Sequence, residues 1–427
     1  MQSPVPLALA NGVRLLALPT SGLATATVAV FVRSGSAHEP KLLNGISHVV
    51  EHMLFKGSAT RDARRINLDA ERLGADVNAH TDRDHTAFYI RGLPEHVGDF
   101  VRMLADLVLQ PTFPADELER ERQVLLQELA EDEDDPVSSA YKLFDAACYG
   151  SHAAALPVIG TRARVERLSR EDLARYVMRQ YRGENVVVGA AGAFDPEAFL
   201  RDASAAFAAL PTGSANVVDL PLYLGGVKTR AQRGSSQTHA VLGGPIAPRR
   251  NAGAADEAAA AMAAAVLGEG MSSPLLHELR EQRALAYHAS ASADAMEMCG
   301  QFVVEASTSP ERFEECLAAV IRLLRGHADS IDADELARAR RQLAVRRLRA
   351  QEKPLRIIEE AALDLFTLGR LRSSSERLAA LQAVPSDAVR AVFERMLEAG
   401  LSLALTGELP RAAGQRARDA LGSLAAG

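Results

Sequence analysis

The 427-residue sequence has few cysteines, no long apolar run and no excess of basic residues. Its three cysteines, Cys148, Cys299 and Cys316, are scattered and lack the spacing of metal ligands, which excludes a disulfide framework and a cysteine-based metal site. We expect them to be small buried apolar side chains in a reducing compartment. The longest apolar run, residues 258–268, is about half as long as a membrane span requires and predicts a buried core helix.

The charge balance and the first residues narrow the class of protein further. A net charge of −7 argues against a nucleic-acid surface, which needs clustered lysine and arginine. Residues 1–4 show neither the basic and apolar regions of a secretory signal nor the arginine-rich pattern of a mitochondrial presequence. We therefore expect a protein of the bacterial cytoplasm that has no nucleic-acid or membrane partner.

One stretch combines two histidines and a glutamate at the spacing of a helical metal site. His48 and His52 are four residues apart and Glu51 lies between them, so a helix places all three on one face. Two neutral imidazole nitrogens at this spacing can occupy adjacent corners of a tetrahedral zinc site, which leaves Glu51 free to act on a water molecule. The order His-x-x-Glu-His is typical of the inverzincins.

A catalytic zinc needs a third protein ligand, and the candidate lies in the charged stretch 119–129. Leu118, Val124, Leu125 and Leu129 are spaced as in an amphipathic helix, with Glu121 and Glu128 on its polar face. Seven residues are two turns, so Glu128 could bind the metal while Glu121 lies behind the ligands. The alternative is a solvated, charged helix without a metal.

Four blocks of sequence occur in the same order as in a known family. They are residues 44–58 around the histidine pair, residues 73–81 with an Asn-Ala-x-Thr core, residues 127–136 with Glu128 and an Asp-Pro pair, and the Arg-to-Tyr segment 280–287. These blocks closely resemble the pitrilysin/insulinase zinc metallopeptidases, in particular the short two-domain bacterial type that resembles mitochondrial processing peptidase subunits. The resemblance spans nearly the whole chain.

The resemblance implies a fold, a cofactor and a set of site residues. The fold is α+β, with two homologous domains that are each a mostly antiparallel sheet flanked by helices, and four such domains enclose a chamber. The cofactor is one Zn²⁺ per chain. The implied residues are His48, His52 and Glu128 as metal ligands, Glu121 behind them, Glu51, Tyr287 and Arg280 as catalytic groups, and Asn78, Ala79 and Thr81 as a substrate-binding edge strand.

The second half of the sequence is a diverged copy of the first. Residues 115–120, Ala-Asp-Glu-Leu-Glu-Arg, recur as residues 333–338, Ala-Asp-Glu-Leu-Ala-Arg. Arg346 occupies the place that corresponds to Glu128, and no histidine pair matches His48 and His52, so only the first half can hold the metal. We predict a zinc-binding domain over residues 1–215, a linker over 216–235 and a metal-free homologous domain over 236–427.

These patterns predict a zinc-dependent endopeptidase. Glu51 would activate water for attack on a peptide bound as an extended strand, while Tyr287 and Arg280 would stabilise the oxyanion or anchor the substrate. The alternative is a non-catalytic or half-site subunit of a heterodimeric peptidase, so the partner is a second copy or a homologous subunit. The substrate stays open among targeting presequences, degraded peptides and a precursor peptide of a cofactor such as pyrroloquinoline quinone.

Two further histidines lie near these blocks, and three residues of the second half differ from the family pattern. We expect His80 to be an exposed strand residue and not a metal ligand, and His85 to be a solvated histidine in a polar turn. Glu269 and Ala284 stand where the family usually has glycine, and Pro274 where a basic residue is common. These departures concern substrate contacts of the second half and leave the zinc half unchanged.

Overall fold

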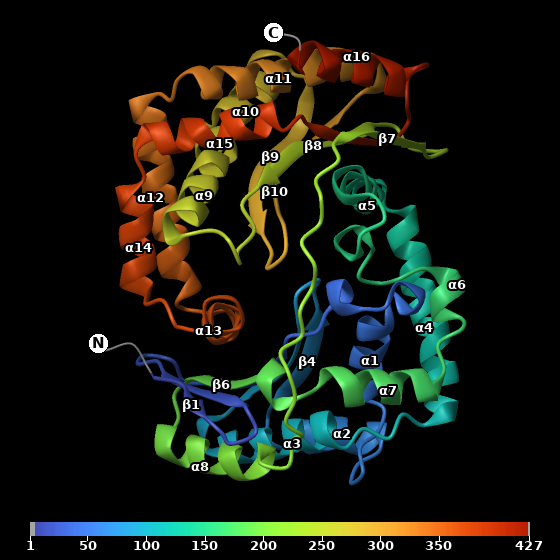
Figure 1. The fold of residues 1–427 in the computed structure, drawn as a ribbon, viewed down its shortest axis with the longest axis vertical. Coiled ribbons are helices and arrows are strands. Elements are labelled where there is room, and N and C mark those ends of the chain that lie inside the picture. Colours follow the sequence, from blue (N-terminus) through green and yellow to red (C-terminus); the bar gives the residue numbers. More distant parts are fainter. Residues whose placement is uncertain (1–4, 426–427) are drawn as a thin grey trace. The chain divides into compact units, whose positions relative to one another are not determined.

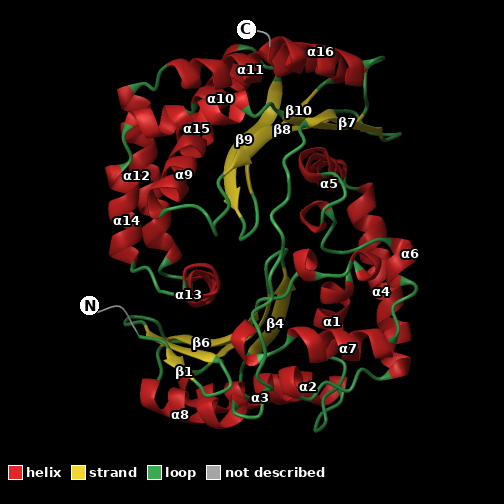
Figure 2. Cartoon of the chain, in the orientation of Figure 1, coloured by secondary structure: helices red, strands yellow, loops and turns green. Residues whose placement is uncertain are grey.

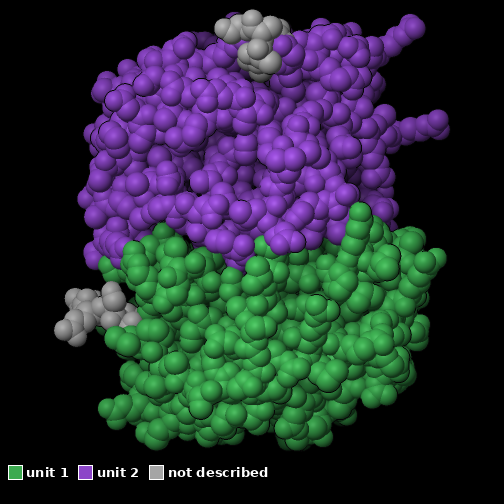
Figure 3. Space-filling model, in the orientation of Figure 1, with its two compact units in different colours: residues 1–129, 157–218, 348–373 green, residues 130–156, 219–347, 374–427 purple. Residues whose placement is uncertain are grey.

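A six-stranded sheet organises the first of the two units of the computed structural model, in which residues 5–425 are described. Figure 3 colours unit 1 green and unit 2 purple. Unit 1 comprises residues 1–129, 157–218 and 348–373, and unit 2 comprises residues 130–156, 219–347 and 374–427. The chain passes from unit 1 into unit 2 after Leu129, after Val218 and after Ser373. The second of these crossings lies inside the predicted linker, whose bounds stay a prediction.

The strands of unit 1 pair antiparallel except for β2 and β6, which are parallel. Figure 1 labels three strands of this sheet, β1, β6 and β4. In spatial order they are β1 (Leu7–Ala8), β2 (Arg14–Pro19), β6 (Val186–Gly192), β3 (Ala26–Val32), β5 (Thr86–Gly92) and β4 (Asp76–Thr81). The helices of this unit are α1 (Ile46–Leu54), α2 (Ala63–Arg72), α3 (Val97–Leu109), most of α4 (Ala115–Asp134), α6 (Arg162–Val165), α7 (Arg170–Gln180), α8 (Pro196–Phe207) and α13 (Pro354–Leu368).

Both faces of this sheet are covered, which explains why β3 is buried at every position. Alternate residues of a strand point to opposite faces, so Val28 and Val30 pack in the core formed with α1 and α3. Ala29 and Phe31 face the other way and pack against Ile358 and its neighbours on α13. A helix from the second half of the sequence therefore closes one face of the first unit.

The five strands described in unit 2 follow the same plan (Figure 2). Their order is β7 (Gly226–Ala231), β11 (Ser402–Gly407), β8 (Thr238–Ile246), β10 (Gly300–Thr308) and β9 (Ala286–Ala295). Strands β7 and β11 are parallel, and the other neighbouring strands of this sheet are antiparallel. The helices are α5 (Pro136–Tyr149), α9 (Ala254–Gly268), α10 (Pro274–Leu276), α11 (Phe313–Asp329), most of α12 (Ala333–Ala350), α14 (Ser374–Ala383), α15 (Ser386–Glu398) and α16 (Ala413–Ala425).

Strand order and connectivity make the two units copies of one α+β plan, as predicted. In chain order β2, β3, β4, β5 and β6 of unit 1 correspond to β7, β8, β9, β10 and β11 of unit 2. The exchange of a helix is also repeated, because α5, from the first half of the sequence, packs on β11, β8 and β7 of unit 2. Each unit thus receives one sheet-covering helix from the other half of the chain.

Several local predictions are confirmed. Residues 258–268 lie in α9 and are mostly buried, and the three cysteines are free and buried. In the described residues, none of the helices is both apolar enough and long enough to traverse a bilayer.

Candidate metal centre

Helix α1 holds the two histidines of the motif on its polar side. Ile46, Val49, Val50 and Met53 are buried in the core of unit 1, and this packing fixes the direction of the opposite face. The rings of His48 and His52 lie on that face one turn apart, with ring centroids separated by 4.7 Å. The core-facing pattern of the helix therefore positions the imidazoles.

The start of α1 is held by a buried carboxylate that the sequence did not reveal. Glu39 accepts hydrogen bonds from the backbone N–H of Gly45 at 2.7 Å and of Ser47 at 2.8 Å. Burial raises the pKa of Glu39 to about 7, although these bonds act in the opposite direction. Gly45 has a φ of 97°, and a Cβ there would come within 2.8 Å of the Gly160 Cα, so this turn requires glycine. No capping spacing links residue 39 to the helix, so local patterns could not identify it.

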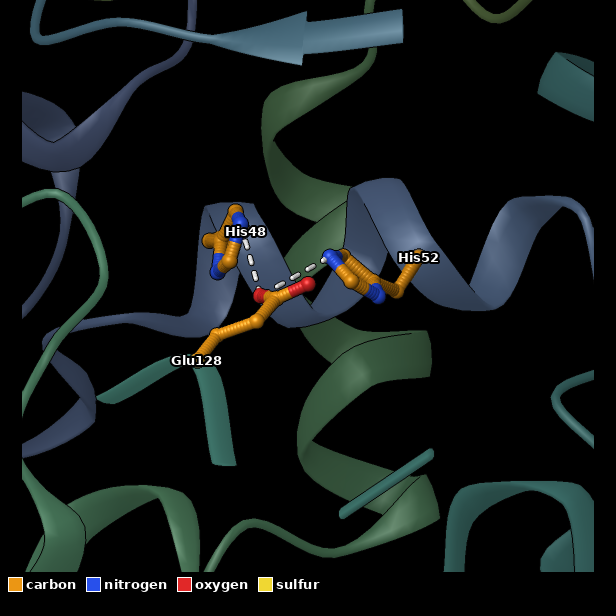
Figure 4. A group of neighbouring side chains, drawn as sticks. All are labelled: His48, His52 and Glu128. Atoms are coloured by element: carbon orange, nitrogen blue, oxygen red, sulfur yellow. Dashed lines mark ion pairs between the residues drawn. The ribbon is translucent and has the colours of Figure 1, made fainter. Parts of the chain in front are cut away.

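Helix α4 supplies the third group at the candidate centre (Figure 4). The Glu128 Oε2 atom lies 3.6 Å from Nε2 of His52 and 3.9 Å from Nε2 of His48. One donor atom from each residue falls within 4.8 Å of the others. The structure thus places Glu128 beside a histidine pair that precedes it by at least 76 positions in the sequence. The Glu128 side chain is 38% exposed. Solvent can therefore reach the centre from the Glu128 side.

Glu121 lies behind His52 and sets its tautomer. Its Oε2 atom is 3.0 Å from Nδ1 of His52, and its Oε1 atom is 2.7 Å from the Lys56 ammonium. Burial acts to raise the pKa of Glu121, but the bonds from Lys56 and His52 outweigh it and hold the pKa below its usual value. An ionised carboxylate can only accept, so the proton of a neutral His52 ring belongs on Nδ1 and the Nε2 lone pair faces Glu128.

The donor set fits a zinc ion. Burial, and then the neighbouring His52, lower the pKa of His48 to about 4, so its ring is neutral. Nδ1 of His48 is buried and has no hydrogen-bond partner among the described residues, so nothing prevents Nε2 from presenting its lone pair. Two imidazole nitrogens and a carboxylate oxygen are usual zinc ligands, and donors in a tetrahedral site with bonds of ~2.0–2.1 Å are about 3.3 Å apart. The observed separations need only a small contraction to reach that value.

Glu51, the carboxylate between the two histidines, is held from the sheet. The Thr81 hydroxyl of β4 donates a hydrogen bond of 2.5 Å to Oε2 of Glu51. Burial raises the pKa of Glu51, while this bond acts against the shift. The sequence suggested Thr81 as a substrate contact, and the structure shows that its side chain orients Glu51.

Strand β4, which carries Asn78 and Ala79, is an edge of the sheet. Among the described strands it pairs with β5 alone, so one row of its backbone groups faces no strand. The Asn78 side chain accepts a hydrogen bond from the backbone N–H of Ala79 at 2.8 Å. An extended peptide can add to such an edge through main-chain hydrogen bonds.

Arg280 and Tyr287 lie together within unit 2, whereas the candidate metal ligands belong to unit 1. The Arg280 guanidinium carbon is 5.1 Å from the centroid of the Tyr287 ring, and Tyr287 is 78% exposed. Ala284, which replaces the family glycine between them, has a φ of 48°. This left-handed conformation is the one that glycine adopts without strain, which explains the family preference.

The expectation for His85 is wrong. We expected a solvated histidine in a polar turn, but His85 is only 2% exposed. The ring lies 5.7 Å from that of Phe31, and its Nε2 atom lies 3.5 Å from Oε1 of Glu359 on α13. The residues that bury it come from a distant strand and from the second half of the sequence, so the local polar pattern gave no sign of them.

A histidine pair on one helix and a carboxylate on another form a donor set of the kind that catalytic zinc sites of peptidases use. Residues 16–162 match the family described as Insulinase (Peptidase family M16), and residues 167–343 match the Peptidase M16 inactive domain. An uncharacterized zinc protease of Streptomyces coelicolor is 30% identical over 97% of this chain and 91% of its own length. An uncharacterized zinc protease of Bacillus subtilis is 27% identical over 94% of this chain and 98% of its own. The chain belongs to peptidase family M16.

Solved structures share the whole fold. A protease from Helicobacter pylori is similar with a TM-score of 0.87 at 19% identity, covering 95% of this chain and 99% of that one. A peptidase M16 inactive domain from Pseudomonas fluorescens gives a TM-score of 0.85 at 22% identity, covering 95% and 98%. These likenesses confirm the two-domain α+β architecture.

Proposed function

We propose that this chain is a zinc-dependent endopeptidase that hydrolyses peptides bound as extended strands. The observation that carries the proposal is the convergence of His48, His52 and Glu128 around one point, beside the oriented carboxylate of Glu51. Its relatives named zinc proteases support the same chemistry. We also propose that the chain binds one zinc ion at this centre and that it acts in the bacterial cytoplasm.

His48, His52 and Glu128 would hold the ion. The two histidines are held in orientation by their surroundings. When bound, zinc supplies Lewis-acid chemistry that polarises the scissile carbonyl and makes water a nucleophile near neutral pH. Glu121 fixes the His52 ring, so that its Nε2 lone pair points to the centre. The core packing of α1 fixes His48 in the same direction.

Glu51 would act as general base and then as general acid. Its carboxylate takes a proton from the attacking water as the water oxygen bonds to the carbonyl carbon. The same proton passes to the amide nitrogen when the C–N bond breaks, so the products are a carboxylate and an amine. Thr81 holds one carboxylate oxygen through its hydroxyl, which leaves the other oxygen for this transfer.

We propose two groups of substrate contacts. The free edge of β4 around Asn78 and Ala79 would pair with the peptide backbone, which makes binding depend little on side chains. Arg280 and the exposed Tyr287 would hold carbonyl groups of the peptide or its developing oxyanion. Tyr287→Phe should then lower kcat, while Arg280→Ala should mainly raise KM.

A metal-exchange assay tests the central proposal. The purified chain should cleave a quenched fluorogenic peptide, lose activity in a zinc chelator and regain it when stoichiometric Zn²⁺ is added. Glu119→Gln, at an exposed position of α4, is a matched control that should leave all three steps unchanged. A zinc-loaded chain that cleaves no peptide in a diverse library would overturn the proposal.

Light scattering combined with the kinetics of the Arg280 and Tyr287 variants tests the assembly. We propose a dimer, either of two copies or with a homologous subunit. If the variants behave as wild type while a co-purifying homologue raises activity, the substrate contacts belong to that subunit and this chain provides the zinc half of a heterodimer.

A further inference from the structure

A second group of potential metal ligands lies elsewhere in unit 1. It consists of His80 on β4, His85 in the turn before β5, and Glu359 on α13. The Glu359 Oε1 atom is 3.7 Å from Nε2 of His80 and 3.5 Å from Nε2 of His85. These separations are as close to the ~3.3 Å of a tetrahedral zinc site as those at the first centre.

The strand geometry separates this group from the first centre. Successive residues of a strand point to opposite faces of its sheet. Thr81 points to the face of β4 where it bonds to Glu51 of α1. His80 therefore points to the other face, where α13 packs and supplies Glu359. The two groups of ligands share neither a residue nor a face of the sheet.

His85 is the residue that most needs a partner. It is buried, and neither of its ring nitrogens has a hydrogen-bond partner among the described residues. A buried polar group without a partner costs free energy, and most native groups of this kind are paired with protein, water or an ion. A cation bonded to Nε2 would give this nitrogen a partner at the point where it faces the Glu359 carboxylate.

Glu359 is suited to be an ionic ligand. Arg356 donates to Oε2 at 2.8 Å, which leaves Oε1 directed toward the two histidines. Two imidazole nitrogens with one carboxylate oxygen favour zinc over calcium or magnesium, which prefer oxygen ligands.

An ion can reach this position from solvent. Glu359 lines a cavity of about 800 Å³ within unit 1, and the His80 side chain is 36% exposed. Water from the cavity can complete the coordination, since the three protein groups leave at least one tetrahedral position open.

We propose that His80, His85 and Glu359 form a second Zn²⁺ site, which fastens α13 to the β4–β5 end of the sheet. The role is structural, because the site joins segments more than 270 residues apart in the sequence at the place where one half of the chain covers the other. The inference does not rest on the proposed peptidase activity. The competing arrangement is a metal-free cluster in which the histidines pair with Glu359 as cations.

Zinc stoichiometry on the full chain tests the site. After equilibration with Zn²⁺ and removal of the free ion, metal analysis should give about two ions per chain for wild type and about one for Glu359→Gln. His80→Asn should give the same loss, and this second variant changes a half-exposed side chain. Glu71 lines the same cavity but is not a member of the ligand group, so Glu71→Gln should keep both ions.

His52→Ala separates the two centres. That variant should also bind about one ion, and the double variant with Glu359→Gln should bind none. Co²⁺ bound to His52→Ala should give visible absorption bands that disappear with Glu359→Gln. Thermal unfolding of His52→Ala should shift upward with added Zn²⁺, and the shift should vanish in the double variant.

Two results would overturn the second site. One is a full zinc complement in folded Glu359→Gln and His80→Asn, and the other is a single ion in wild type that His52→Ala removes. If wild type binds one ion that Glu359→Gln removes and His52→Ala does not, the second site stands and the peptidase centre fails.

Discussion

Helices α4 and α12 begin with nearly the same sequence but differ at the positions that matter for metal chemistry. Both start Ala-Asp-Glu-Leu, and both bury their first leucine. Counted from that start, Glu121 corresponds to Ala339 and Glu128 corresponds to Arg346. Ala339 is fully buried, and Arg346 forms an ion pair with Glu269. The second copy has replaced both carboxylates without losing the helix.

Helices α1 and α9 show the same contrast. Each follows the strand at the same place in its sheet, β3 or β8, but α9 is rich in alanine and carries no histidine. The sheet order is nevertheless the same in both units. The comparison shows that the fold does not depend on the ligand residues, so the metal centre can be altered in unit 1 while the fold is kept.

His52→Ala should produce the largest effect, because it removes a ligand from the first copy. We expect zinc affinity at that centre to fall by more than the roughly 10–100-fold that loss of an outer partner costs, and peptidase activity to be abolished. His277→Ala, an exposed histidine of unit 2, is the control. If metal content and activity were unchanged in His52→Ala, the first copy would not hold the metal through this residue, and the predicted difference between the two copies would be wrong.

Glu51→Gln should leave zinc and peptide binding intact but lower kcat by at least ~10²-fold, since general acid–base catalysis contributes that much. Single-turnover kinetics with metal analysis on the same sample measures both. A variant with near-wild-type kcat would reduce Glu51 to a structural residue.

The leucine pair Leu125 and Leu343 tests the shared scaffold, because the two occupy the same place in α4 and α12. Both are buried, so replacement of either by alanine should lower the free energy of unfolding by about 2–5 kcal/mol. Only Leu125→Ala should also weaken zinc binding, since α4 carries Glu121 and Glu128. Denaturant unfolding and zinc titration of both variants make the comparison, and equal weakening of zinc binding would refute it.

Glu121→Ala gives the first copy the residue that the second has. We expect zinc affinity to fall by ~10–100-fold, because His52 loses the acceptor that fixes its ring. Competition with a chromophoric chelator measures this loss. Glu119→Ala, at an exposed position of the same helix, should have no such effect.

Arg346→Glu should produce the smallest effect. It restores a carboxylate to the second copy, but no histidine helix faces it, so zinc stoichiometry should not change. The lost ion pair with Glu269 is partly exposed and should cost less than about 1 kcal/mol. An additional bound zinc ion would show that unit 2 retains ligands that its sequence conceals.

Local sequence patterns predicted the fold and the first metal centre, but they did not predict the second group of ligands. The four-residue spacing of His48 and His52 determines their common face on any helix, and the strand and helix pattern repeats in both halves. Glu39 and Glu359 could not be found in this way, and neither could the contact of Thr81 with Glu51, because these partners are fixed by tertiary packing and not by spacing. His85 shows the limit of local patterns, because a histidine in a polar stretch of sequence is buried in the structure.

The exchanged helix α13 has a consequence for synthesis of the chain. The last strand of the unit 1 sheet, β6, ends at Gly192, but the helix that covers the face with Leu16, Phe31 and Val187 ends at Leu368. At translation rates of about 5–20 residues per second, that apolar face waits on the order of ten seconds for its cover. Unit 1 therefore cannot complete its folding on the ribosome before most of unit 2 has been made, and a nascent chain paused in this interval exposes a surface prone to aggregation.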